Sequence, residues 1–412
     1  MRQSTFSNRV IIFEVCSRQQ NIHSILLGEM MKICIFVRIL WAGGVQRIAF
    51  AEAEQLSSKG HSVDLIFLRK VGNLTYNTAI PYTVVYEETI QDRLSAKLLQ
   101  RITRIYAPER GKDATVDLDL IRKFERRRQD YDVIIYFDQH AAFFAKYGRK
   151  KHKGKIVVYI HETSLKGREG LIPHFVDKRA LKHASAILTQ SKFNQDVLSR
   201  FGYKNIYLIY PGTDTHEQNP PFEQRDDIAL SVTMWDWGRK PEVLLNIAEK
   251  MNEGQLVLAG SWADREYMEH FKRRVKEKNL VERLIVTGPL EEDLLKDYYR
   301  RAKVVIRFGY NEAGPGMGSL EGISYGIPLI INSGIGIKEV VEEGKHCFVV
   351  DEKEPIQIVE KLNLLFNDSK TWERISRNNI ALSKELSWEN HGLLLESILK
   401  SVVEKPTQAE SR

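Results

Sequence analysis

Residues 307–341 read RFGYNEAGPGMGSLEGISYGIPLIINSGIGIKEVV, and this stretch decides the fold. The apolar run 303–308 predicts a buried strand that leads into it. A loop with four glycines follows, then a predicted helix over 319–325 and a second predicted strand over 328–332. A strand, a glycine-rich loop, a helix and a strand in this order are typical of a parallel α/β sheet, which binds ligands at the carboxyl ends of its strands.

The glycine-rich loop has the chemistry of a phosphate site. Glycine lets the backbone come close to a ligand, and the N–H groups at a helix N-terminus attract phosphate. Glu312 and Glu321 flank the loop, and a carboxylate can accept paired hydrogen bonds from the vicinal hydroxyls of a ribose or a hexose. The loop therefore predicts a nucleotide-sugar site. The residues expected to contact this donor are Gly316, Met317, Gly318, Ser319, Leu320 and Glu321.

The stretch resembles the donor-binding signature of retaining family 4 glycosyltransferases, which have the two-domain GT-B architecture. Glu321, the Gly-x-Pro at 326–328 and the Gly-x-x-Glu-Val-Val turn at 336–341 match that signature. The family places seven residues between its two glutamates, whereas eight separate Glu312 from Glu321. Either the loop holds one extra residue or the first role is lost; we favour the insertion, because Gly and Pro can absorb it. The alternative for Glu321 is a solvated helix residue.

A second strand–helix–strand unit lies near the N-terminus. Predicted strands over 32–37 and 62–68 flank a predicted helix over 46–59, and Gly43 and Gly44 precede the helix. The G-x-G-x-x-G fingerprint of dinucleotide-binding proteins is absent from this unit. The family resemblance implies that the paired glycines bring N–H groups near the donor phosphates or the acceptor; the alternative is a simple tight turn. Arg47, in the first helical turn, could reach an anion.

His161 directly follows a predicted strand over 155–160. The carboxyl end of a parallel strand lies at the crevice where open α/β sheets bind ligands. In family 4 a histidine at this place faces the donor sugar, and the resemblance implies the same role for His161. The alternative is a structural histidine with satisfied hydrogen bonds.

The cations expected to hold a diphosphate follow the predicted strand over 228–233. Family 4 usually has an arginine at this strand end and a lysine five or six residues later. Lys240 fits the lysine, but Met234 or Trp235 stands at the arginine position. Arg239 could take its place from a neighbouring position. This departure leaves room for an inactive relative.

The length of 412 residues predicts two domains. At least eleven predicted strands alternate with helices, so we expect an α/β fold of GT-B type, with two doubly wound Rossmann-like domains facing across a cleft. The expected parts are an extension at 1–30 with the native start near Met30 or Met31, an N-terminal acceptor domain at 31–214, a linker at 215–227, a donor domain at 228–385, and a helix at 386–405 that crosses back to the first domain.

Composition points to an intracellular globular protein. A hydrophobic content of 43% with 28% charged residues is ordinary for a soluble chain. The three cysteines are far apart and odd in number, which indicates a reducing compartment and neither a disulfide framework nor a zinc site. No apolar run is long enough to span a membrane. We therefore expect a cytoplasmic location.

The sequence predicts no metal and no cofactor besides the nucleotide-sugar co-substrate. The motif Asp117-Leu-Asp119 formally resembles a metal-binding Asp-x-Asp, but it lies in a charged stretch and does not follow a clean strand. GT-B enzymes usually stabilise the leaving diphosphate with cations of the protein, and the resemblance implies the same here.

The net charge of +7 includes two basic clusters, at 101–128 and 146–155. Such runs are most often solvated faces, and the sharper alternative is a surface for anionic lipid headgroups at the inner face of the membrane or for a phosphate-bearing acceptor. Nucleic acid is not expected, because the second cluster offers only Tyr147 for stacking and no nucleic-acid motif is present.

The resemblance implies a retaining enzyme that moves a hexose from a nucleotide-diphosphate sugar to a glycan or a lipid-linked glycan. It implies attack on the front face of the sugar, without a protein nucleophile. The residues expected in catalytic roles are His161, Glu312, Arg239 and Lys240. The alternatives are a nucleotide-sugar epimerase or hydrolase of the same fold, and a non-catalytic nucleotide-sugar binding protein.

Overall fold

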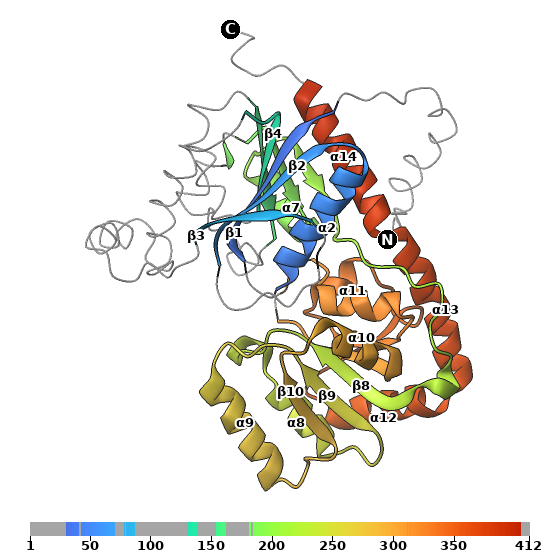
Figure 1. Ribbon diagram of the computed structural model, residues 1–412. Helices are drawn as coiled ribbons and strands as arrows, with labels where there is room; N and C mark the ends of the chain where they lie inside the picture. The colour runs from blue at the N-terminus through green and yellow to red at the C-terminus, as the bar shows by residue number, and fades with distance from the viewer. Residues whose placement is uncertain are drawn as a thin grey trace, which may run out of the picture.

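Two parallel β-sheets organise the chain (Figure 1). The computed structural model describes residues 30–40, 43–70, 78, 80–86, 130–137, 154–161, 181–182, 184–310, 312 and 314–404. Each sheet has helices packed against it and apolar side chains on both faces. The α/β class with two doubly wound, Rossmann-like sheets is therefore confirmed.

The first sheet has the strand order β3-β2-β1-β4-β5-β6-β7, and all its pairs are parallel. Its strands are short and apolar, and β4 and β5 are buried on both faces, as a parallel sheet covered by helices requires. The strand bounds are β1 Lys32–Leu40, β2 Ser62–Lys70, β3 Tyr82–Tyr86, β4 Val133–Phe137, β5 Lys155–Ile160, β6 Ala186–Thr189 and β7 Ile206–Leu208.

The second sheet has the order β10-β9-β8-β11-β12-β13 and is also parallel throughout. Counted from its own first strand, this order is 3-2-1-4-5-6, so the direction of winding reverses between β8 and β11. Ligands of doubly wound sheets bind outside the carboxyl ends of the strands at this switch point. The strand bounds are β8 Asp226–Val232, β9 Gln255–Ala259, β10 Leu284–Gly288, β11 Ala302–Arg307, β12 Leu329–Asn332 and β13 Cys347–Val350.

Several helices begin at a side-chain cap or at a glycine turn. Ser191 accepts a hydrogen bond from the N–H of Asn194 at the start of α7, as the cap rule predicts. Asp264 does the same for two N–H groups of α9. The helix bounds are α2 Gly44–Ser58, α7 Lys192–Arg200, α8 Glu242–Ala248, α9 Arg265–Glu277, α10 Glu292–Arg301, α11 Met317–Ser324, α12 Pro355–Asn367, α13 Ser369–Glu385 and α14 Trp388–Glu404, with 3-10 turns η4 Phe222–Gln224, η5 Trp237–Arg239 and η6 Gly336–Glu339.

The C-terminal helix α14 leaves the second sheet and packs on the first, where it lies beside α2 (Figure 1). Leu395 and Leu399 are fully buried in the same apolar cluster as Ile33 of β1. Gly392 allows the close approach to α2, because a Cβ there would lie 2.7 Å from Cβ of Gln55. The end of the chain thus ties both sheets into one molecule.

Candidate active site

Three side chains meet at the carboxyl end of β11. Glu312, in the loop after the strand, is 7% exposed. Its Oε1 accepts a hydrogen bond of 2.8 Å from Nη2 of Arg307, the last residue of β11. The same oxygen forms an ion pair with Nη1 of Arg239. The fold therefore brings together two residues that the sequence singles out, Arg239 and Glu312, and adds a buried arginine that it does not.

The cluster of Arg239, Arg307 and Glu312 carries more positive than negative charge, and the nearby charge of Asp236, which raises the pKa of both arginines, compensates the excess in part. Burial and, to a smaller extent, the nearby charge of Arg239 together lower the pKa of Arg307 to about 9. Burial also lowers the pKa of Arg239. Two guanidinium groups that share one carboxylate oxygen make a site that favours an additional anion.

Lys240 lies in the same loop as Arg239, beyond the end of β8. Asp236 accepts the N–H of Arg239 at 2.9 Å and so fixes the turn. Lys240 adopts a left-handed backbone with φ of 45°, a conformation that is uncommon for a residue with a Cβ and is concentrated at functional sites. Its ammonium group lies 4.0 Å from the ring centroid of Tyr310.

The position that lacks the expected arginine is Met234. Trp235 cannot stand there, because it is 2% exposed and its indole N–H donates to the carbonyl of Ala259 at 3.1 Å. Met234 is 41% exposed in the loop after β8.

The helix α11 begins at Met317, two residues before the predicted start at Ser319. Gly316 is the N-cap residue, and its carbonyl accepts the N–H groups of Ser319 and Leu320 at 3.1 and 3.2 Å. These two N–H groups are therefore engaged within the helix. Those of Met317 and Gly318 have no hydrogen-bond partner among the described residues.

The glycine turn of the first sheet faces this helix. Gly43 is the N-cap of α2 and accepts the N–H of Arg47 at 3.2 Å. A Cβ at Gly44 would lie 3.3 Å from Cγ of Met317, and Met317 packs against the cores of both sheets. The two predicted glycine-rich segments, one on each sheet, therefore meet.

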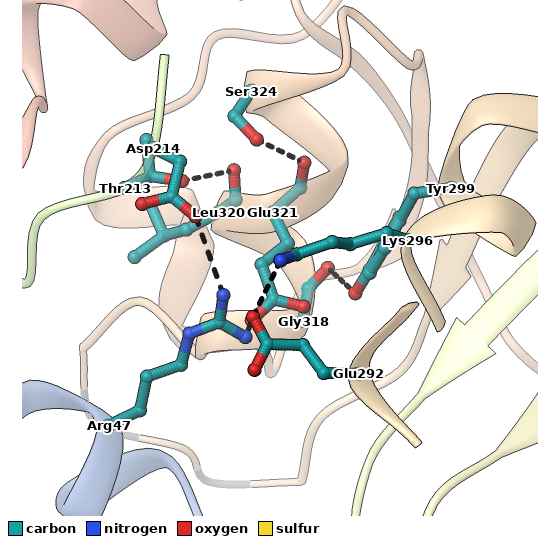
Figure 2. Close-up of polar contacts among 10 residues, drawn as sticks. All are labelled: Arg47, Thr213, Asp214, Glu292, Lys296, Tyr299, Gly318, Leu320, Glu321 and Ser324. Atoms are coloured by element: carbon teal, nitrogen blue, oxygen red, sulfur yellow. Dashed lines mark hydrogen bonds and ion pairs between the residues drawn. The ribbon is translucent and has the colours of Figure 1, made fainter. Parts of the chain in front are cut away.

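Glu321 is buried between the two halves of the molecule. Figure 2 shows Arg47 extending from α2 toward Glu321 and Asp214. Nη1 of Arg47 pairs with Oε1 of Glu321, and Nη2 lies 3.5 Å from Asp214 Oδ2. Burial raises the pKa of Glu321, and the charge of Arg47 partly opposes this rise. The alternative of a solvated helix residue is therefore wrong.

The surroundings of Glu321 hold α11 in place. The hydroxyl of Tyr299 donates to the carbonyl of Gly318 at 3.0 Å, and that of Thr213 donates to the carbonyl of Leu320 at 3.1 Å (Figure 2). Gly318 itself packs against the end of β8, since a Cβ there would lie 2.6 Å from the carbonyl oxygen of Val232.

His161 lies at the carboxyl end of β5, but its ring is covered. The imidazole stacks against Phe137 with centroids 4.7 Å apart and against Tyr159 at 3.9 Å. Neither ring nitrogen is exposed, and neither has a hydrogen-bond partner among the described residues. Burial lowers the pKa of His161 to about 3, so the ring is neutral at physiological pH.

Arg307 and Tyr299 are the residues that sequence reasoning missed. Arg307 interrupts an apolar strand at its carboxyl end, and a charged residue at that place signals a buried partner or a ligand. Tyr299 gave no comparable signal, because its helix reads as an ordinary amphipathic one.

Several expectations fall on residues outside the described ones: Cys16, the Asp117–Asp119 motif, the basic cluster at 101–128, residues 146–153 of the second cluster and residues 1–29 of the extension. Among described residues, no group of three His, Cys, Asp or Glu side chains is arranged to hold a metal ion. No described helix is both long and apolar enough to cross a membrane. Cys34 and Cys347 are buried free thiols.

Comparisons with known proteins agree with this architecture. The family model described as Glycosyl transferases group 1 matches residues 213–381, and that of Glycosyltransferase Family 4 matches residues 42–217. A D-inositol 3-phosphate glycosyltransferase of Xylanimonas cellulosilytica is 26% identical over 215 residues, which are 47% of this chain and only about half, 51%, of that protein. An uncharacterized glycosyltransferase of Methanocaldococcus jannaschii is 23% identical over 82% of this chain and 89% of its own.

Similar solved structures share the fold. Sucrose-phosphate synthase from Thermosynechococcus elongatus superposes with a TM-score of 0.70 at 17% identity, over 90% of this chain and 99% of that one. HepE of Anabaena in complex with UDP-glucose gives a TM-score of 0.67 at 14% identity, over 90% and 100%. Since the two family models together extend from residue 42 to residue 381, through both sheets, the chain belongs to the family 4 glycosyltransferases of GT-B fold.

Proposed function

We propose that the protein is a retaining glycosyltransferase that moves a hexose from a nucleoside-diphosphate sugar to a glycan or a lipid-linked glycan. One observation carries the proposal: at the start of α11, two N–H groups without a partner among the described residues come after Glu312, a carboxylate held by cations, and before Glu321, a buried carboxylate. Phosphate suits the helix terminus, and the hydroxyls of ribose and sugar suit the carboxylates.

The charge on the diphosphate grows as the bond from the sugar to its oxygen breaks. Fixed cations that face this charge stabilise the transition state more than the ground state. In the proposal, Arg239 and Lys240 supply the cations, and the N–H groups of Met317 and Gly318 supply neutral donors. Burial of Arg239 strengthens its electrostatic effect, because the local dielectric constant is lower there than in water.

The sugar would be oriented by His161 and Glu312. A neutral imidazole has one donor and one acceptor, and both ring nitrogens of His161 are unpaired among the described residues. A sugar hydroxyl that reached them would satisfy polar atoms that are costly to leave buried without partners. Because the ring is covered, this role requires a side-chain adjustment when the donor binds.

The first test is a thermal-shift panel of UDP-, ADP- and GDP-sugars, with and without chelator. UDP-glucose heads the panel, since a HepE structure of similar fold contains it. A ligand that binds only the folded protein raises the melting temperature by mass action. A shift with one base that survives the chelator supports the proposal, including metal-independent binding. The absence of any shift would contradict it.

The reaction itself is tested by NMR of the anomeric proton. We expect a product with the same anomeric configuration as the donor, formed only with an acceptor. Release of free sugar or isomerisation from the donor alone would favour the hydrolase or epimerase instead. Donor binding without turnover in any acceptor mixture would favour the non-catalytic binding protein.

The acceptor side of the proposal includes a cytoplasmic reaction at the membrane surface, since a lipid-linked acceptor is presented there. Sedimentation with liposomes at low salt tests this part. We expect binding to vesicles that contain anionic lipid and none to neutral vesicles; equal recovery with both would contradict contact through the basic clusters.

A further inference from the structure

Arg307 is a buried cation at the switch point of the second sheet. It ends β11, the strand next to β8, and the strand order reverses between these two. The other residues of the strand include Val304, Val305 and Ile306, which are at most 1% exposed. Removing a guanidinium group from water costs free energy unless anions compensate it, so this position demands a partner.

Glu312 compensates this charge only in part. It serves Arg307 and Arg239 through the same oxygen. Burial and the charge of Arg239 both disfavour the protonated form of Arg307 and hold its pKa down, to about 9. The group is thus charged at physiological pH in a place where a second anion would stabilise it.

The anion site at the start of α11 lies at the same edge of the sheet. Val305 of β11 pairs with Leu230 of β8, so two residues further along Arg307 lies level with Val232. The carbonyl oxygen of Val232 touches α11 at Gly318, where a Cβ would lie 2.6 Å from it. Arg307 and the two unpartnered N–H groups of α11 therefore converge on the ends of neighbouring strands.

We propose that Arg307 binds the diphosphate of the donor and replaces the strand-end arginine that Met234 does not supply. The inference rests on the proposed function. Glu312 holds Arg307 in position, and phosphate oxygens take over part of its hydrogen bonding as the donor binds. The guanidinium of Arg307 then acts with Arg239 as a pair of cations on the leaving group.

Calorimetric titration of the Arg307→Met variant tests the assignment with UDP, ADP and GDP and the matching nucleosides. For the base that the wild type prefers, we expect the Kd of the diphosphate to rise at least tenfold and that of the nucleoside to change less than twofold. Arg307→Lys should give an intermediate loss of diphosphate affinity, because lysine keeps the positive charge but lacks the planar, two-pronged set of donors of a guanidinium group. Equal losses for diphosphate and nucleoside would show a merely structural role and overturn the inference.

A rescue variant shows whether Arg307 takes the role of an arginine at position 234 or whether its loss only disrupts the fold. Met234 is exposed at the end of the neighbouring strand, so Arg307→Met combined with Met234→Arg should recover most of the diphosphate affinity. No recovery would overturn the replacement of one arginine by the other. If Arg307→Met does not fold, Arg307→Met with Glu312→Gln removes both charges and allows the same comparison. A wild type that binds none of the diphosphates would instead overturn the proposed function, and this inference with it.

Discussion

The Glu321 carboxylate is an acceptor for two kinds of donor, the guanidinium of Arg47 and the hydroxyls of the proposed ligand. Its ion pair with Arg47 joins α11 to α2 across the two halves of the molecule. Such a pair balances a buried charge, and Asp214 shares the same guanidinium at 3.5 Å. A ribose bound by Glu321 therefore has to share this carboxylate with Arg47 or displace it.

Glu321→Gln should weaken nucleotide binding by about 1.5–3 kcal/mol, the range for a hydrogen bond to a charged group. Calorimetric titration with the preferred nucleoside diphosphate measures the loss, and Glu343→Gln, at an exposed site, is the control. Affinity equal to that of the wild type would remove the ribose role from Glu321.

The burial of His161 makes the stability of the folded protein depend on pH. Its pKa is about 3 in the folded protein and about 6.5 in an unfolded chain. Between these values the unfolded state binds more protons, so the stabilisation is complete above pH 6.5 and is lost as pH falls toward 3. At pH 5 the folded protein must keep this imidazole neutral, which lowers the free energy of unfolding by about 2 kcal/mol.

Urea unfolding at pH 7.5 and pH 5 tests this linkage. His161→Asn should lose about 2 kcal/mol less than the wild type over that interval, because it has no group to protonate. His270→Asn, which removes an exposed histidine of α9, should follow the wild type. If the His161 variant also followed the wild type, the acid sensitivity would arise elsewhere.

At the level of elements, the sequence predicts strands better than it predicts helix starts. The strands of the second sheet are short apolar runs of four to seven residues, a length and composition that favour a buried strand over a helix. The sequence pattern predicts that α11 begins at Ser319, after the glycine-rich loop. Gly316 caps the helix instead, and the first turn packs so closely on β8 that a Cβ at Gly318 would lie 2.6 Å from the carbonyl oxygen of Val232.

Contacts between distant segments could not be predicted from one sequence. Gly44 against Met317 and Arg47 against Glu321 connect residues more than 270 positions apart, and no local pattern encodes them. The cluster of Arg239 with Glu312 depends on the same long-range packing. The family resemblance pointed to Glu312 and Lys240 as site residues, but it assigned no role to Arg307 at the end of β11.

The start of α7 is closed by a carboxylate from the other half of the molecule. Glu339 of η6 accepts the hydroxyl of Ser191 at 2.8 Å and the N–H of Lys192 at 2.7 Å. Negative charge at a helix N-terminus is favourable, and here it also links the two sheets. The Gly-x-x-Glu-Val-Val turn thus has a structural role in addition to its place in the family signature.

Glu339→Ala should lower the free energy of unfolding by about 1–3 kcal/mol, the cost of a lost cap and charged hydrogen bonds. Urea denaturation measures it, with Glu343→Ala on the same turn as the exposed control. A loss no larger than that of the control would mean that Ser191 alone suffices as the cap.

At the level of the whole molecule, α14 makes the two sheets one cooperative unit. Its anchor is polar as well as apolar: Nδ1 of His391 lies 2.7 Å from the carbonyl oxygen of Tyr210, and Nε2 lies 2.9 Å from Oε1 of Glu52 on α2. Since a carbonyl only accepts, Nδ1 carries a proton. One further proton then lies between Nε2 and the carboxyl group, whose pKa burial raises.

Because the proton is shared, substitution of Glu52 and substitution of His391 should lower the stability by different amounts. In Glu52→Gln the amide can still donate to Nε2 of a neutral ring, so the cost should be about 1 kcal/mol. In His391→Phe the fully buried Glu52 carboxyl group and the Tyr210 carbonyl both lose their partner, and each buried polar group left without a partner costs about 1–3 kcal/mol. Thermal and urea unfolding should therefore rank His391→Phe far below Glu52→Gln. Both residues act electrostatically near the His161 ring, but neither is among the residues proposed to bind the nucleotide, so the nucleoside diphosphate affinity of the folded variants should equal that of the wild type. If Glu52→Gln proved as damaging as His391→Phe, the pair would have to be an imidazolium–carboxylate ion pair, and α14 would be held by charge instead of by a shared proton.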